Sequence, residues 1–212
     1  MKRTPMRVVT LAATKGGVGK TTLTAALAVR AAQESRRVAL IDLDPQESLI
    51  SWWERRGKTK NPKLFEIDAT TEAIELLMSQ GWEWVFIDTS PAKIELIEPG
   101  IAVADLVIIP CRPSALDVEQ VGVPVEMCEQ FNKPYAFVLN HAPTSWKLTK
   151  STAAYLNSTN GTVLGTAVPF RQAYMAAPTV GKSGPEVDKD GGAAKDIDAL
   201  WDELKTLLAK VR

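Results

Sequence analysis

The stretch that decides the fold is VVTLAATKGGVGKTT at residues 8–22. It begins with an apolar run at residues 8–13, and a helix-compatible stretch follows it at residues 23–32. This order predicts a buried strand, a glycine-rich loop and a helix. Glycines let consecutive backbone N–H groups converge on anionic oxygens, and the amino end of a helix adds a partial positive charge. The alternative is a glycine-rich turn with an incidental lysine, but no ordinary core element needs all of these features together.

The loop carries side chains suited to a nucleoside triphosphate. Lys20 places a point charge beside the β- and γ-phosphates, and the hydroxyl of Thr21 can bind Mg²⁺. The strict pattern G-x-x-x-x-G-K-[ST] fails at one position, because Thr14 stands where the first glycine is expected, and Lys15 adds a second lysine. The predicted nucleotide-binding residues of the loop are Lys15, Gly16, Gly17, Val18, Gly19, Lys20, Thr21 and Thr22.

The second lysine gives this loop a resemblance to the deviant Walker A box of the ParA/MinD family of ATPases. The resemblance implies that Lys15 reaches the phosphates of the nucleotide bound by a partner subunit, so that ATP bridges two copies of the chain. An extra cation over the γ-phosphate stabilises charge during phosphoryl transfer. Lys15 could otherwise be a solvated loop charge. Lys15 and Lys20 are therefore predicted to be catalytic in an ATPase that depends on dimerisation.

A second motif, IDLDPQ at residues 41–46, ends the next apolar stretch with two carboxylates. Buried carboxylates are costly when unpaired, so a cation or a hydrogen-bond network is expected near them. The motif resembles the D-x-D-P-Q box of the ParA family, which is that family's first switch. This resemblance implies that Asp44 positions or polarises the attacking water. Asp42 would then support the Mg²⁺ shell or the loop itself. The alternative is an Asp-Pro turn in which Asp44 caps the following helix.

A third motif, WVFIDTSP at residues 84–91, also ends an apolar strand with a carboxylate. In P-loop enzymes the aspartate at this Walker B position holds Mg²⁺ directly or through water. Asp88 and Thr21 are thus the main candidate metal ligands, with Asp42 beside them. The ParA family usually shows D-T-P-P, and Ser90 replaces the first of these prolines, which should loosen the second switch without removing metal binding. A turn or capping role for Asp88 is the alternative.

The choice of base follows from NHAP at residues 140–143, because a guanine site of the GTPase type needs N-K-x-D. The missing acid favours adenine. By resemblance to the ParA family, Asn140 contacts the adenine. The segment VPFR at residues 168–171 resembles the family's I-P-x-R, which implies that Pro169 packs around the base and ribose and that Arg171 points toward the partner or the switch region.

Strand-like and helix-like stretches alternate along the chain, which predicts an α/β fold with a mainly parallel, twisted sheet covered by helices on both faces. We expect one P-loop NTPase domain over residues 1–212, without an amino-terminal helix-turn-helix extension. The segment at residues 181–192 is expected to be a loop. The predicted strands are 7–13, 38–43, 64–67, 84–87, 106–109, 135–139 and 163–167, and the predicted helices are 21–33, 47–56, 71–79, 95–103, 117–131, 147–157 and 193–210.

Composition fits a compact cytoplasmic protein and excludes several classes. The chain has 212 residues and 45% hydrophobic content, enough for a sizeable core. Cys111 and Cys128 lack C-x-x-C spacing and are expected to be reduced core residues, and the single histidine offers no metal cluster. No apolar run is long enough for a signal core or a bilayer span, so secretion and stable membrane insertion are not expected.

Charge is balanced overall but segregated along the chain. Residues 1–33 and 130–185 contain no Asp or Glu, although the net charge is zero. If these stretches share a face, that face attracts polyanions. The alternative is that they simply contain buried strands and the phosphate loop. The predicted DNA-contacting residues are Lys147, Lys150, Arg171 and Lys182.

Together these features predict an ATP- and Mg²⁺-dependent ATPase that dimerises with ATP and then binds DNA nonspecifically. Its role would be partition or positioning of plasmid, chromosome or protein cargo, with hydrolysis stimulated by a small partner or adaptor protein and with the chain on the nucleoid. A MinD-like membrane-associated ATPase and a non-catalytic nucleotide-binding module remain alternatives. Residues 204–212 are expected to pack on the domain rather than to form a membrane anchor, and Lys15 speaks against a biotin-pathway ligase. The two cysteines lack the surroundings that an iron–sulfur reductase needs.

Overall fold

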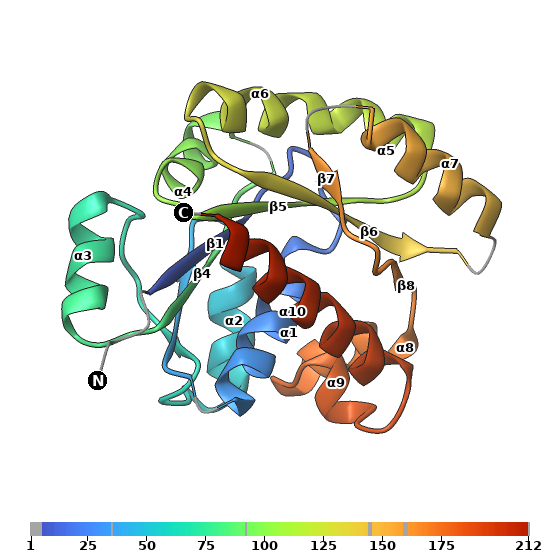
Figure 1. The fold of residues 1–212 in the computed structure, drawn as a ribbon. Helices are drawn as coiled ribbons and strands as arrows, with labels where there is room; N and C mark the ends of the chain where they lie inside the picture. Colours follow the sequence, from blue (N-terminus) through green and yellow to red (C-terminus); the bar gives the residue numbers. More distant parts are fainter. Residues whose placement is uncertain (1–5, 35, 92, 144–145, 159–160, 212) are drawn as a thin grey trace.

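The computed structural model describes residues 6–34, 36–91, 93–143, 146–158 and 161–211 (Figure 1). Within these ranges the strands form a parallel sheet in the order β3-β2-β4-β1-β5-β6-β7, and β8 pairs with the far end of β6. The strand order reverses beside β1, where a doubly wound sheet opens a crevice for ligands. The strands are β1 (Arg7–Leu11), β2 (Val38–Asp42), β3 (Lys63–Leu64), β4 (Trp84–Asp88), β5 (Leu106–Cys111), β6 (Tyr135–Ala142), β7 (Thr162–Val163) and β8 (Val168–Pro169).

Helices cover both faces of the sheet, as predicted (Figure 1). One face packs on α1, α2 and α10, and the other on α3, α4, α6 and α7. The helices are α1 (Lys20–Gln33), α2 (Ser48–Arg55), α3 (Thr71–Ser79), α4 (Glu98–Ala102), α5 (Ala115–Val118), α6 (Gly122–Gln130), α7 (Trp146–Leu156), α8 (Gln172–Ala176), α9 (Gly184–Val187) and α10 (Gly192–Lys210), with 3₁₀ turns η1 (Ile94–Leu96), η2 (Glu119–Val121) and η3 (Ala177–Val180).

The central strands are apolar on both sides because both sides are buried. In β1, Val9 and Leu11 face the α1 side while Val8 faces the α3 side, and all three are at most 3% exposed. Burying such a side chain contributes about 1.5–3 kcal/mol. This core fixes the register of β1 against β4, so that Leu11 lies opposite Asp88. The carboxyl ends of β1, β2 and β4 therefore meet at one edge of the sheet.

Aromatic residues and the last helix close the α1 side of the core. Trp201 of α10 is fully buried, and its ring centroid lies 4.6 Å from that of Trp84. Leu204 and Leu208 are buried as well, which confirms that this helix packs on the domain. Trp52 is 1% exposed and belongs to the same hydrophobic core as Trp84 and Trp201. It is therefore a packing residue rather than an exposed surface on which nucleic-acid bases could stack.

The structure corrects the expected elements mainly in the carboxyl-terminal third. Of the strand expected at 163–167, only Val163 lies in a strand: β7 ends there and β8 begins after the predicted range. The backbone N–H of Gly165 and the hydroxyl of Thr166 donate to Glu203 of α10 rather than to a neighbouring strand. The segment 181–192, expected to be a loop, contains α9, whose first turn is held by a capping box between Ser183 and Glu186. The helix expected at 117–131 is interrupted by η2.

Candidate nucleotide site

The glycine-rich loop connects β1 to α1 and lies against the end of β6. Gly17 and Gly19 have φ values of 72° and 93°, in the left-handed region that glycine adopts without strain. A Cβ on Gly19 would come within 2.1 Å of Nδ2 of Asn140, so this position has no room for a side chain. Gly17 and Gly19 are therefore needed for backbone conformation, and Gly19 also for close packing.

Lys20 and Thr21 begin α1 and point toward the switch aspartates. Lys20 is 6% exposed, and burial lowers its pKa while the charges of Asp88 and Asp44 oppose that effect. The two carboxylates offset only part of the cost of burying this cation, because its pKa stays lowered. This is the environment expected for a group that meets phosphate oxygens.

Asp88, at the end of β4, is the most deeply buried acid of the site. Its Oδ2 accepts a hydrogen bond of 2.5 Å from the hydroxyl of Thr21, and its buried Oδ1 has no hydrogen-bond partner. Burial raises the pKa of Asp88 to about 7. An orphaned carboxylate oxygen beside a hydroxyl fits Mg²⁺, which takes few protein ligands and completes its shell with water and phosphate. Within the described ranges, no group of three or more His, Cys, Asp and Glu side chains forms a self-sufficient metal cage.

Both carboxylate oxygens of Asp42 accept hydrogen bonds from backbone N–H groups in and after the first switch. Its Oδ1 accepts from the N–H of Asp44 at 3.0 Å, and its Oδ2 accepts from Leu49 at 3.0 Å and Ile50 at 3.1 Å. These bonds anchor the amino end of α2 to β2. Of the two roles predicted for Asp42, its contacts in this structure support the loop rather than the metal shell.

Asp44 is half-buried and faces a cavity of 360 Å³, which we call the phosphate cavity. Its Oδ1 accepts from the N–H of Gln46 at 3.1 Å. The same cavity is lined by Lys20, Thr21 and Pro91. The predicted catalytic residues Lys20 and Asp44 therefore line one cavity, and Thr21 lines it as well.

Lys15 points away from this space in the single chain. Its Nζ lies 3.3 Å from Oδ1 of Asp117, at the start of α5. Asp117 also accepts from Nε of Arg112 at 2.9 Å and from the hydroxyl of Ser114. Sequence reasoning treated Asp117 only as the start of a helix, and nothing near it in sequence indicates that it pairs with the phosphate loop.

A second cavity, of 420 Å³, adjoins the loop on the β6 side, and we call it the base-side cavity. Asn140 lines it, but its Nδ2 donates to the carbonyl of Val18 at 2.7 Å, so this amide also holds the phosphate loop. Val168, Phe170 and Arg171 line the cavity, whereas Pro169, which follows Val168, does not. The lining residues that sequence reasoning did not identify include His141, Tyr174 and Met175.

Arg171 is paired within the chain. Its Nε lies 2.6 Å from Oδ2 of Asp196, and its Nη2 donates to Oδ1 at 2.9 Å. This two-point pair raises the pKa of Arg171 and compensates its charge. Arg171 is therefore the least suited of the four residues predicted to contact DNA.

The other predicted DNA-contacting residues do not form one cluster. Lys147 and Lys150 are exposed on α7, whereas Lys182 lies between η3 and α9 and lines the phosphate cavity. Figure 1 shows α7 and α9 in different parts of the molecule. The α7 pair is thus the part of the prediction that could act as a surface.

Cys111 and Cys128 are free and buried, and burial raises the pKa of each thiol to about 12. They are inert core residues, as expected.

Known proteins resemble this chain in sequence and in fold. The maintenance of carboxysome distribution protein A of Gloeobacter kilaueensis is 36% identical over 122 residues, which are 53% of this chain and 52% of that protein. The ParA protein of Rhizobium radiobacter is 33% identical over 115 residues, 53% and 51% of the two chains. The chain thus aligns with about half the length of these curated relatives.

Among solved structures, a putative plasmid partition protein of Borrelia burgdorferi bound to AMPPNP superposes with a TM-score of 0.75 over 95% of this chain and 99% of that one, at 17% identity. This likeness confirms the predicted fold class. The model of the CobQ/CobB/MinD/ParA nucleotide binding domain matches residues 9–183, which include the phosphate loop, both switches and the base-side cavity. The chain belongs to the CobQ/CobB/MinD/ParA family of nucleotide-binding domains.

Proposed function

We propose that this chain is an ATPase of the ParA type, which hydrolyses ATP bound between two copies of itself. The observation that carries this proposal is the convergence of Lys20, Thr21 and Asp88 at a glycine-rich loop, with Asp44 across the same cavity. Lys20 neutralises β/γ-phosphate charge, and Asp44 orients water for attack on the γ-phosphorus. Mg²⁺, when bound, would compensate phosphate charge beside Thr21 and Asp88.

The resting position of Lys15 supports dependence on a second copy. In the single chain the ammonium is held 3.3 Å from Asp117, and its side chain is 30% exposed. A triphosphate presented by a facing copy offers more negative charge than one carboxylate, which favours exchange of this pair for phosphate contacts. Turnover would then be slow until two copies meet.

The proposal also includes three further properties: DNA binding, cargo positioning and stimulation by a small partner. They are supported by the similarity to ParA of R. radiobacter and to the carboxysome distribution protein. Lys147 and Lys150 supply exposed positive charge for phosphate contacts. No helix in the described part of the chain is long and apolar enough to cross a membrane. We place the chain on the nucleoid.

The test combines two assays on the purified chain. Phosphate release with ATP and Mg²⁺ is expected from the wild-type chain, and its absence under all conditions, with DNA included, would overturn the ATPase. Mobility shifts with ATP are expected to weaken for Lys147→Gln/Lys150→Gln, with a salt slope reduced by about one per lysine. Retention that is independent of nucleotide or salt would contradict the DNA surface.

A further inference from the structure

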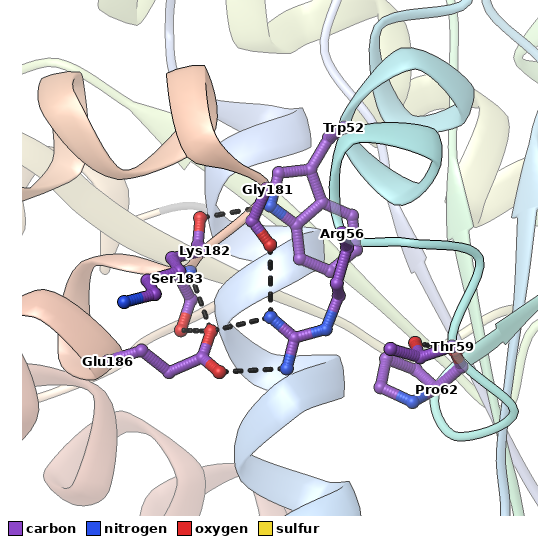
Figure 2. Close-up of polar contacts among 8 residues, drawn as sticks. All are labelled: Trp52, Arg56, Thr59, Pro62, Gly181, Lys182, Ser183 and Glu186. Carbon is purple, nitrogen blue, oxygen red and sulfur yellow. Dashed lines mark hydrogen bonds and ion pairs between the residues drawn. The ribbon is translucent and has the colours of Figure 1, made fainter.

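The carboxyl end of α2 is fastened to the segment that follows β8. Figure 2 shows the residues of this contact, which we call the Arg56 cluster: Trp52, Arg56, Gly181, Lys182, Ser183 and Glu186. Nη1 and Nη2 of Arg56 lie 2.7 and 2.8 Å from the two carboxylate oxygens of Glu186. The Arg56 side chain is 15% exposed and the Glu186 side chain 19%, so this pair is largely shielded from water.

Residues at the carboxyl end of α2 also bind the backbone of the 177–187 segment. Nη1 of Arg56 donates to the carbonyl of Gly181 at 3.1 Å, and Nε1 of Trp52 donates to the carbonyl of Lys182 at 2.9 Å. Gly181 has a φ of 66°, and a Cβ there would lie 2.2 Å from the backbone nitrogen of Arg56. Glu186 accepts from the N–H of Ser183 at 2.8 Å, so the acid that binds Arg56 also shapes the segment.

The same segment forms part of the nucleotide cavities. Pro178, Lys182 and Ser183 line the phosphate cavity, and Pro178 also lines the base-side cavity. The opposite end of α2 is tied to Asp42, which in turn holds the N–H of Asp44. One short helix therefore connects the wall of the nucleotide cavities to the first switch, and both of its ends are anchored.

We propose that the Arg56 cluster positions Asp44 for hydrolysis, by fixing α2 to the cavity wall so that Asp44 is held across from Lys20. Arg56 and Glu186 are positioning residues, because they act through the helix and line neither cavity. A guanidinium is suited to this role, since its planar fork binds a carboxylate at two points and fixes an orientation that a lysine does not. The inference rests on the proposed ATPase activity.

The first test separates turnover from binding in a double-mutant cycle of Arg56→Ala, Glu186→Ala and the double variant. We expect kcat per folded molecule to fall by about tenfold in each single variant, while the dissociation constant for a fluorescent ATP analogue changes less than about threefold. The double variant should lose no more than either single one, because the two residues act as a unit. Glu186→Gln keeps the side-chain volume and an acceptor, and it should lie between the wild-type chain and Glu186→Ala.

A matched control comes from a second arginine–glutamate pair. Nη1 of Arg36 lies 3.0 Å from Oε1 of Glu83, before β2 and β4 and far along the strands from the site. Arg36→Ala should leave kcat within about twofold of the wild-type chain, because this partly exposed ion pair lies away from the site. A lower melting temperature with unchanged kcat in the Arg56 variants would overturn the proposal, since the cluster would then be merely structural.

The second test does not require hydrolysis. Hydrogen exchange of the nucleotide-free chain should become faster in the peptide covering residues 44–51 when Arg56 is replaced by alanine, and should stay unchanged in Arg36→Ala. Unchanged exchange in Arg56→Ala overturns the inference. If the wild-type chain shows no turnover, the proposed function fails, and this exchange result alone decides whether the cluster positions the first switch.

Discussion

The two ends of the nucleotide site are built differently. At the phosphate end, Lys20 is 6% exposed and Asp88 is fully buried, and both face other groups of the site. At the base end, Phe170 is 58% and Met175 62% exposed, although both line the base-side cavity. The phosphate end is thus preformed within one chain, whereas the base end keeps apolar surface open to solvent.

This difference indicates which part of the chemistry the single chain can supply. Preorganised charges at the phosphate end stabilise a developing charge without rearrangement. At the base end, apolar side chains stay exposed to solvent. At the loop, Lys15 pairs with Asp117 and does not face the phosphate cavity. Under the proposed function, one chain holds the triphosphate and the site becomes competent when another copy covers it.

The largest expected effect comes from the phosphate end. Lys20→Ala removes the buried cation beside Asp88 and Asp44, and it should lower kcat/KM for ATP by about 100-fold or more. Lys60→Ala, at an exposed position after α2, is the matched control and should have no effect. Phosphate release and equilibrium nucleotide binding measure both. A Lys20→Ala chain with ordinary affinity and turnover would refute the assignment of this end.

Asp44→Ala is expected to separate binding from turnover. The phosphate loop stays intact, so the chain should hold ATP with an affinity within about threefold of the wild type, while kcat falls by about 100-fold. Parallel titration and single-turnover hydrolysis provide the measurement. If Asp44→Ala hydrolyses ATP at the wild-type rate, another group orients the water.

Asn140→Ala tests the comparison of the phosphate end with the base end. Asn140 binds the phosphate loop through Val18 and also lines the base-side cavity. Its removal leaves the buried carbonyl of Val18 without a partner, at a cost of about 1–3 kcal/mol, so nucleotide binding should weaken by roughly tenfold. If the amide mainly holds the loop, ATP and GTP binding weaken equally. A loss confined to ATP would instead assign Asn140 to recognition of adenine.

The smallest effect is a pH dependence of stability at the Arg56 cluster. Burial raises the pKa of Glu186, but hydrogen bonds from Arg56 and Ser183 outweigh burial and hold the pKa below its ordinary value of 4.5. The stabilisation from the charged Glu186 is complete above pH 4.5, and it is lost as the pH falls through the lower pKa that Glu186 has in the folded chain. The free energy of unfolding of the wild-type chain should therefore exceed that of Glu186→Gln by about 1–2 kcal/mol at neutral pH. Denaturation at several pH values should show this gap closing in acid; a constant gap would contradict a charged Glu186.

The sequence predicted that Lys20, Asp44 and Asp88 lie together, because they belong to short motifs at strand ends, whereas Lys15 pairs with Asp117 instead. The loop, Asp44 and Asp88 meet as soon as β1, β2 and β4 are parallel and in register. The base end and the Arg56 cluster depend on contacts between distant segments. The pairing of Arg56 with Glu186 spans 130 positions, and no periodicity or spacing indicates it. The same holds for Arg171, whose partner Asp196 lies on α10.

The most direct test of the account is the mass of the ATP-loaded chain in solution. Asp44→Ala, which is expected to retain ATP, should change from the monomer mass of 23.1 kDa with ADP to twice that mass with ATP and Mg²⁺ in light scattering. The additional replacement Lys15→Ala should abolish the doubling while leaving ATP bound. A chain that binds ATP and stays at the monomer mass would contradict a site completed by a second copy.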